Sequence, residues 1–521
     1  MKVIDASKLQ QMVIGAYKYL EENKSYVDEL NVFPVPDGDT GTNMNMTMKS
    51  GVDKVNQTSL SSVEEIAKAL SQGTLMGARG NSGVILSQLV RGMAKALKGK
   101  DEIGALELKE IFVNASKTAY RAVMQPTEGT ILTVARLMGE KAEEVFSSGT
   151  NLDDYLVEIL AAGQQALDNT PKQLPVLKEA GVVDSGGQGL IFLLRGALNA
   201  LNGDIDKDID LSSDTSDEGK YIINFALAIS KEDFENIENS LKNSSTNFDY
   251  EFKDGLVTAT LRTEHTQQII NTLLVDGVLV KLELENTSDH IEKTNNKTQK
   301  LNKYGFIAVS RGEGYDEILK SMNIDKIISG GQTMNPSTED IYKNIEDINA
   351  ENIIIFPNNK NIIMSAKQAC ELTDKNARVL ETKSIPETFT AMLEFDEADD
   401  IDDNIETMSD TISDMHTGEV SISIRDTSVN NIEIKKDDYL GILDGKIVVS
   451  KADLEETARE VINKAVDEDD DISLVTIYYG EEASKKKAKD LVKKLSKDHK
   501  DIDVELVFGG QPVYYYQITL E

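Results

Sequence analysis

The spacing of apolar residues divides the chain into a helical part and a part with alternating strands and helices. Up to about residue 200, apolar side chains recur at the three- and four-residue intervals that place them on one face of a helix. Five stretches show this repeat: 8–22, 62–71, 83–97, 105–123 and 152–167. Glycine-rich loops separate these stretches, and no run alternates as a strand would. Residues 1–203 are therefore predicted to form an all-α domain whose loops gather at one end and hold a site.

The pattern changes after a segment rich in Asp, Ser and Gly at 203–220, a composition typical of a linker. Residues 220–288 read in the order strand, helix, strand, strand, helix, strand. The two central strands are joined at Lys253-Asp254-Gly255, a turn signal typical of a hairpin. This order predicts a ferredoxin-like α+β module as the middle domain.

A second polar linker is expected at 288–303, and residues 304–521 then contain an internal repeat. The segments 306–332 and 473–511 each read as strand, helix and strand, closed by Gly-Gly-Gln. They predict a C-terminal α/β region built from two similar units. Acidic runs at 396–403 and 466–471 are expected in solvated loops. The fold class is thus multidomain, with α and α/β parts.

Composition narrows the function. The chain carries 90 acidic and 55 basic residues, a net charge of -35, which repels the phosphates of nucleic acids and of anionic membranes. No apolar run approaches the roughly 20 residues of a membrane span. The N-terminus lacks the apolar stretch of a signal peptide, and the single cysteine, Cys370, excludes an internal disulfide. These features predict a cytoplasmic protein with no integral membrane segment and no nucleic-acid partner.

The segment NVFPVPDGDTGTNM (31–44) carries the clearest candidate chemistry. Asp37 and Asp39 flank a glycine on a loop, so both carboxylates can face one cation, and Asn31 offers a third oxygen. Mg²⁺ prefers such hard oxygen ligands and usually bridges substrate phosphates. A helix start is a ready anion site, and it follows at once, at Thr40, Thr42 and Asn43. The alternative for this segment by itself is a capped turn with an aspartate at the helix start.

Three further glycine-rich loops precede predicted helices and strengthen the phosphate-site interpretation. One contains Gly80, Asn81, Ser82 and Gly83; another, PTEGT, contains Thr130; the third contains Asp184, Ser185 and Gly186. Backbone amides in such loops can bind phosphate oxygens, although no Gly-Lys-Ser/Thr sequence of a Walker motif is present. Four such loops in one helical domain favour a phosphate site over unrelated turns.

These segments resemble the ATP-binding domain of the dihydroxyacetone kinase family, of the L-subunit type. Over nearly its full length the chain resembles the large, ATP-binding subunit of bacterial fatty acid kinases. The matching segments are PVPDGDTGTNM, MGARGNSGVILSQ, PTEGT and VVDSGGQG in the helical part, and GGQTMNPSTEDI, FPNNKNIIM, VTIYYGEE and FGGQPVYYY in the C-terminal part.

The resemblance implies an α-helical barrel that binds ATP with Mg²⁺ through Asp37, Asp39 and Asn31. It implies that the acyl substrate arrives on a separate fatty-acid-binding protein and that the product is an acyl phosphate for phospholipid synthesis. It also implies a homodimer formed through the middle domain. The family pattern has cysteine and histidine zinc ligands in that domain, whereas Thr260 and Arg262 stand here where histidines are expected. No zinc is therefore expected.

Transfer to a fatty acid needs no general base, because a carboxylate is already ionised at pH 7. Arg79 is the candidate for stabilising charge on the transferred phosphoryl group, and its alternative is a loop arginine paired with surface acids. Two other functions stay open, a kinase for a small molecule such as dihydroxyacetone and a non-catalytic nucleotide-binding scaffold. The C-terminal region is expected to dock the acyl-carrying partner and to lie outside the ATP site. Three consecutive tyrosines, Tyr514, Tyr515 and Tyr516, predict at least one exposed aromatic ring there.

Overall fold

A computed structural model represents the chain as two compact units. One comprises residues 1–205 and 301–521, and the other comprises residues 206–300. The structure describes residues 3–521 except 32–37, 58–60, 124, 148–150, 204–220, 231–232, 235–236, 239–240, 243, 254, 264–265, 276–277, 287–300, 332–334, 424–425 and 430–431. The two predicted linkers lie almost entirely outside these described residues.

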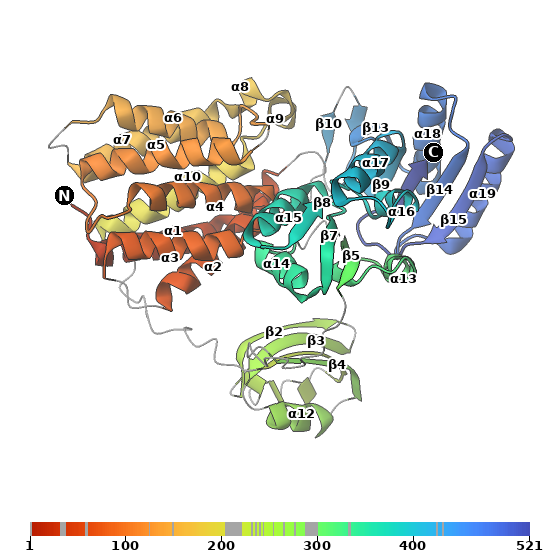
Figure 1. Ribbon diagram of the computed structural model, residues 1–521, viewed down its shortest axis with the longest axis horizontal. Helices are drawn as coiled ribbons and strands as arrows, with labels where there is room; N and C mark the ends of the chain where they lie inside the picture. The colour runs from red at the N-terminus through yellow and green to blue at the C-terminus, as the bar shows by residue number, and fades with distance from the viewer. Residues whose placement is uncertain are drawn as a thin grey trace. The chain divides into compact units, whose positions relative to one another are not determined.

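The N-terminal part is a ring of helices, drawn in red to yellow in Figure 1. Each long helix packs on the next, and the last of them, α10, packs against α1 and α7, so the ring closes. The helices are α1 (Ala6–Glu29), α2 (Thr40–Asn56), α3 (Val63–Met76), α4 (Gly80–Ala96), α5 (Ala105–Ala122), α6 (Ile131–Glu144), α7 (Leu152–Asp168), α8 (Thr170–Gln173), α9 (Pro175–Ala180) and α10 (Ser185–Asn202). The predicted all-helical N-terminal part is confirmed.

Local sequence explains where several of these helices begin. Asp5 accepts a hydrogen bond from the Lys8 amide at the start of α1, and Ser62 accepts one from the Glu65 amide at the start of α3. Such caps satisfy amides that have no partner within the helix. The apolar faces of the helices then meet inside the ring.

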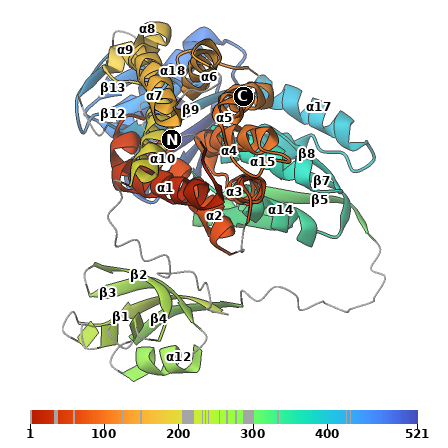
Figure 2. The ribbon, with the colours of Figure 1, turned by 90° about the vertical axis from the view of Figure 1, so that its left-hand side faces the viewer.

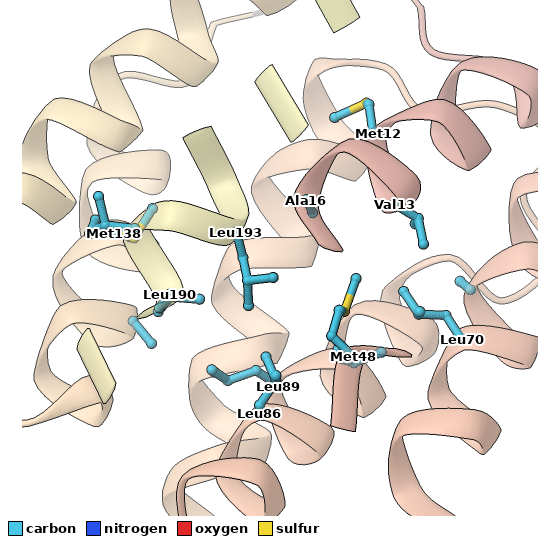
Figure 3. Close-up of a cluster of buried hydrophobic side chains, with 14 of the residues drawn as sticks. Met12, Val13, Ala16, Met48, Leu70, Leu86, Leu89, Met138, Leu190 and Leu193 are labelled. Carbon is cyan, nitrogen blue, oxygen red and sulfur yellow. The ribbon is translucent and has the colours of Figure 1, made fainter. Parts of the chain in front are cut away.

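The interior of the ring is apolar and contains a cavity of 190 Å³. Figure 3 shows Met48, Leu86 and Leu193 converging from different helices around it. Leu86 is only 3% exposed. A cavity next to tightly packed leucines means that removing further side-chain atoms enlarges a void that the neighbouring side chains do not fill.

The unit of residues 206–300 contains one antiparallel sheet with the strand order β2-β3-β1-β4. Its described elements are β1 (Tyr221–Ala228), β2 (Thr246–Lys253), β3 (Leu256–Thr263), α12 (Thr266–Val275) and β4 (Val278–Asn286). All four predicted strands and the second predicted helix are present. Thr260 on β3 donates a hydrogen bond to the Asn224 side chain on β1, so hydroxyl and amide groups pair at that position of the sheet.

The C-terminal part begins with a parallel sheet in the order β6-β5-β7-β8. Helices α14 and α15 cover one face of it through an isoleucine-rich core, and α13, α16 and α17 contribute to a second core on the other face. The elements are β5 (Asn302–Ser310), α13 (Glu313–Ser321), β6 (Lys326–Ser329), α14 (Thr338–Asp347), β7 (Ala350–Phe356), α15 (Lys360–Leu372), β8 (Asn376–Val379), α16 (Ile385–Leu393) and α17 (Ile401–Ser413).

A mixed sheet with the order β13-β12-β9-β16-β14-β15 follows, and α18 and α19 pack on it. A small hairpin, β10 with β11, stands beside it. The elements are β9 (His416–Ile422), β10 (Thr427–Val429), β11 (Ile432–Ile434), β12 (Tyr439–Leu443), β13 (Lys446–Lys451), α18 (Leu454–Glu468), β14 (Leu474–Tyr479), α19 (Lys485–Asp498), β15 (Asp503–Phe508) and β16 (Tyr516–Leu520).

The two halves of the predicted repeat form two strand-helix-strand units with parallel strands, one in each sheet. The first is β5-α13-β6 and the second is β14-α19-β15. They meet where the carbonyl of Gly509 accepts a hydrogen bond from the Tyr315 amide. Gly312 makes this approach possible, since a Cβ there would lie 2.5 Å from the Gly509 oxygen. The α/β character of the C-terminal part is confirmed.

Two expectations for this part are wrong. Both acidic runs are only partly loops. In 396–403, α17 begins at Ile401, and Asp400 accepts hydrogen bonds from the Asp402 and Asp403 amides. Acidic side chains are stabilising at a helix N-terminus. In 466–471, the first three residues belong to the end of α18. The expected exposed tyrosine is also absent from the described C-terminal strand, since Tyr514 and Tyr516 are buried and Tyr515 packs edge-on against Tyr439.

The helices of the described residues include none that is both long enough and apolar enough to cross a membrane.

The packing around the cavity generates a stability prediction. Leu86→Ala should lower the stability of the helical ring by about 2–5 kcal/mol, because it removes buried methyl groups beside an existing void. Urea unfolding followed by circular dichroism measures this. Leu106→Ala is the matched control, since Leu106 on α5 is 43% exposed and its truncation should cost less than about 0.5 kcal/mol. Equal losses in the two variants would contradict the packing described.

Candidate functional site

Asp39 stands at the N-terminus of α2 but does not cap that helix. Asp28, in the last turn of α1, fills this role, because its carboxylate accepts hydrogen bonds from the Thr42 amide at 3.0 Å and from the Thr42 hydroxyl at 2.8 Å. The Asp39 carboxylate is therefore free of the capping role that an aspartate at this position usually has. It is nevertheless buried, with 7% of the residue exposed.

Two amide side chains hold Asp39. The Nδ2 of Asn335, from the loop between β6 and α14, donates to Asp39 Oδ2 at 2.7 Å. Asn43, one turn into α2, also forms a side-chain hydrogen bond with Asp39. Burial raises the pKa of the Asp39 carboxyl above its usual range, and the hydrogen bonds from Asn43 and Asn335 lower it. A cation beside the carboxylate would favour its ionised form.

The N-termini of α2, α4, α6 and α10 meet at this end of the ring. Ser185 at the start of α10 donates to the Thr40 hydroxyl of α2 at 3.3 Å. The Arg79 amide, just before α4, donates to Thr47 of α2 at 3.2 Å. The Ile131 amide at the start of α6 is hydrogen-bonded to Asp184. Because the helix dipole places partial positive charge at a helix start, four helix starts together suit phosphate groups.

Gly80 illustrates how closely these segments approach. Its φ is +59°, a left-handed conformation that favours glycine. A Cβ on Gly80 would lie 2.6 Å from the Asn43 amide nitrogen, so no other residue fits there without moving Asn43. Gly83 likewise lets Thr47 of α2 approach α4, and Gly186 packs against Ile131. Glycine is therefore required here for close packing as well as for the turns.

Asp184 has a capping role. Its Oδ2 accepts a hydrogen bond from the Gly187 amide at 2.7 Å, and its own amide donates to the Thr170 hydroxyl. The Asp184 carboxylate thus caps α10, and it contributes to the predicted site by fixing the start of that helix. Thr130 similarly donates to the Thr127 carbonyl at 2.7 Å and begins α6.

The C-terminal part reaches this site, which contradicts the expectation that it lies outside. Arg79 Nη1 donates to the Asn335 carbonyl at 2.7 Å, and Nη2 lies 3.5 Å from Asp340 Oδ2. Asn81 Nδ2 lies 3.3 Å from Asn361 Oδ1 at the start of α15. Figures 1 and 2 show α14 and α15 beside α3 and α4. The ion pair with Asp340 agrees with the alternative for Arg79, a loop arginine paired with an acidic residue. The role of Arg79 in stabilising charge on a phosphoryl group stays a prediction.

The oxygen atoms at Asp39 fit a divalent cation in kind. Its carboxylate is supported by two amide side chains, and the Asn335 Oδ1 beside it is buried without a hydrogen-bond partner among the described residues. The described residues hold no group of three or more acidic, histidine or cysteine side chains that could bind a metal ion. Asp37, the second predicted carboxylate, lies outside them, and Asn31 lies just after α1, where its amide donates to the Asp28 carbonyl.

Sequence reasoning missed Asp28 and Asn335. The only local signal at Asp28 is an acidic residue in the last turn of a helix, where the helix dipole disfavours it. Asn335 lies within GGQTMNPSTED, a segment of the C-terminal region that is expected to dock the partner. Two residues further on, Ser337 caps α14 by accepting a hydrogen bond from the Asp340 amide, and its own amide donates to the Asp340 carboxylate.

Asp184 generates a pH prediction. Burial raises its pKa to about 6 in the folded chain, whereas an unfolded aspartate titrates near 4. The folded chain therefore retains the proton longer, and this group makes stability fall as pH rises from about 4 to 6, with no further change above that. Asp184→Asn keeps the capping oxygen and removes this slope. Urea midpoints between pH 4.5 and 7.5 should show the variant gaining relative to the unaltered chain until about pH 6.5. Parallel curves would contradict the burial of this carboxyl.

Comparison with known families matches two parts of the chain. Residues 34–199 match the model of the DAK2 domain, and residues 305–521 match the model of the C-terminal region of FakA-like fatty acid kinase proteins. An uncharacterized protein of Staphylococcus aureus (strain bovine RF122 / ET3-1) is 38% identical over 548 residues, covering 99% of each chain. An uncharacterized protein of Staphylococcus epidermidis is 36% identical over 550 residues, again covering 99% of each.

Among solved structures, the Streptococcus pneumoniae fatty acid kinase B3 protein loaded with linoleic acid is similar over 42% of this chain and 99% of its own, with 10% identity and a TM-score of 0.29. The dihydroxyacetone kinase from C. freundii in complex with AMP-PNP and Mg²⁺ is similar over 56% of each chain, with 10% identity and a TM-score of 0.32. On the full-length relatives and the two family models, the chain belongs to the FakA-like family of fatty acid kinase proteins and carries an N-terminal DAK2 domain.

Proposed function

We propose that this chain is the ATP-binding subunit of a fatty acid kinase. It binds ATP with Mg²⁺ at the four helix starts of the ring and transfers the terminal phosphoryl group to the carboxylate of a fatty acid. The fatty acid is presented by a separate fatty-acid-binding protein, and the acyl phosphate product serves phospholipid synthesis. The chain acts in the cytoplasm.

The proposal rests mainly on one observation, that the Asp39 carboxylate is buried at the start of α2 but does not cap that helix. A carboxylate at a helix start normally caps that helix, yet Asp28 caps α2 and Asp39 is held in place by amides from two different segments. Burying a carboxylate is unfavourable unless other groups compensate for its charge. Asp39 is buried, held in one orientation and not used as a helix cap, so its carboxylate can bind a metal ion. The four helix starts beside it can bind the phosphates of a nucleotide.

The chain's own residues have distinct roles in this mechanism. The amides at the start of α4, and those amides at the starts of α2 and α10 that do not donate to Asp28 or Asp184, bind phosphate oxygens, and the hydroxyls of Thr40 and Ser185 lie beside them. Gly80 lets the backbone approach without a side chain in the way. A bound Mg²⁺ would neutralise charge on the phosphates. The acceptor carboxylate is ionised at pH 7, so the site needs no base and consists of positioning and charge-stabilising groups.

A cavity in the C-terminal part has both charged and apolar walls. It measures 670 Å³, and its lining includes Lys360, Lys383, Glu387, His416 and Glu419. Burial raises the pKa of Glu419 to about 7 and also raises that of Glu387. The lining also includes Ile405, Ile412 and Ile442, so the cavity offers charged and apolar surface side by side.

We further propose a homodimer formed through the middle domain. Its β4 is an edge strand, and Val278 and Val280 on it are 70% and 62% exposed. Exposed apolar side chains on a sheet edge favour association with another chain. Thr260 and Asn224 offer a hydroxyl and an amide, which are poor zinc ligands. The dimer is therefore proposed without a bound metal.

The metal site generates an activity prediction. Asp39→Asn, and likewise Asp37→Asn, should lower the rate of acyl phosphate formation at least 100-fold, because losing a metal ligand removes several kcal/mol of charge neutralisation in the transition state. The measurement is ATP-dependent acyl phosphate formation with fatty-acid-loaded binding protein, with circular dichroism to verify the fold.

Asp53→Asn is the matched control, since Asp53 is an exposed aspartate on the same helix, and it should keep normal turnover. Near-normal turnover in both site variants would refute the assignment. Phosphorylation of dihydroxyacetone in place of the fatty acid would favour a small-molecule kinase, and nucleotide binding without any turnover would favour a scaffold.

A further inference from the structure

We infer that Asn335, supplied by the C-terminal part, is a positioning residue of the candidate metal site. It orients Asp39 and couples binding of the metal-nucleotide complex to the contact between the helical ring and the C-terminal part. The inference rests on the proposed function, because it assumes that Asp39 faces a metal ion.

The first observation is the geometry of the contact. Asn335 Nδ2 lies 2.7 Å from Asp39 Oδ2, and the two residues are 296 positions apart in the chain. Asn335 is 3% exposed and Asp39 is 7% exposed, so water does not readily replace either partner. A hydrogen bond to a charged group contributes about 1.5–3 kcal/mol, more than one between neutral groups. This single amide therefore restricts which way the buried carboxylate points.

The second observation is that the backbone of Asn335 is itself clamped. Arg79 Nη1 donates to its carbonyl at 2.7 Å, and the Arg79 guanidinium also reaches Asp340. At the first residue of α14, the Thr338 amide donates to the Ala78 carbonyl at 3.0 Å. These contacts join the start of α14 to the residues just before α4. Asn335 thus holds Asp39 through a backbone segment that is fixed to the helical ring.

The third observation is an unused acceptor. Asn335 Oδ1 is buried and has no hydrogen-bond partner among the described residues. Leaving such an atom unpaired costs about 1–3 kcal/mol, and buried polar atoms in folded proteins nearly always have a partner. An atom beside a candidate metal ligand can gain that partner from a metal-bound water molecule. The amide then contacts Asp39 through its nitrogen and the metal hydration shell through its oxygen.

The consequence is coupling between two parts of the chain. If Asn335 lowers the free energy of the metal-bound site, then metal and nucleotide must in turn strengthen the contact that brings Asn335 to Asp39, because such coupling is reciprocal. A partner that docks on the C-terminal part would act on the same contact. Groups that support a metal ligand from outside its coordination shell typically change metal affinity about 10–100-fold.

The test compares Asn335→Ala with Gln368→Ala in the full chain. Gln368 is the matched control, because its buried amide also crosses between the two parts, donating to the Leu75 carbonyl at 2.8 Å, and contacts Gln88 and Thr338 instead of Asp39. Binding of a fluorescent ATP analogue is measured with and without Mn²⁺, and melting temperature is recorded in parallel. Asn335→Ser, whose side chain is too short to reach Asp39, is the second variant.

We expect Asn335→Ala and Asn335→Ser to weaken Mn²⁺-dependent nucleotide binding at least tenfold and to leave metal-free binding unchanged. Gln368→Ala should change Mn²⁺-dependent binding less than threefold at a similar melting temperature. Equal losses in Gln368→Ala and Asn335→Ala, or unchanged binding in the Asn335 variants, would overturn the inference while leaving the proposed function standing. An unaltered chain that shows no Mn²⁺-dependent nucleotide binding would overturn the proposed function and the inference with it.

Discussion

The candidate site depends on the hydrogen bonds between Asp28 and Thr42. Through them, a residue outside α2 accepts a hydrogen bond from a first-turn amide of that helix. The Asp39 carboxylate therefore does not have to cap α2. If Asp39 had to accept these hydrogen bonds itself, its carboxylate would point back along its own helix, as capping residues do. Because Asp28 does so instead, Asp39 can accept hydrogen bonds from Asn43 and Asn335 and face the other helix starts.

The ring topology explains why those helix starts meet. When long helices joined by short loops pack each on the next, neighbours run in opposite directions. Counted around this ring, α2, α4, α6 and α10 hold the even places, so their N-termini lie at one end. The glycine-rich loops precede these four helices. The alternation of helix direction therefore gathers the positive ends of four helix dipoles at one end of the ring, and such ends favour anions.

The C-terminal part also supplies residues that contact the candidate site. Its two strand-helix-strand units lie in different sheets and meet at Gly312 and Gly509. A separate hydrogen bond, from the Thr338 amide to the Ala78 carbonyl, holds the start of α14 against the helical ring. Arg79 and Asn335 join the two parts at this contact. The loop after β6 and the start of α14 thus lie between the candidate site and the remainder of the C-terminal part.

Sequence patterns alone predict the helices of the ring, the loops that precede alternate helices, the strands of the middle domain and both strand-helix-strand units. Apolar periodicity, capping residues and glycine positions are local, so their physical consequences can be predicted from short segments. The capping of α2 by Asp28 in place of Asp39, and the contact between Asn335 and Asp39, become visible only in the folded chain. Hydrogen bonds between residues 14 and 296 positions apart depend on how helices and domains pack, and no local pattern encodes that packing.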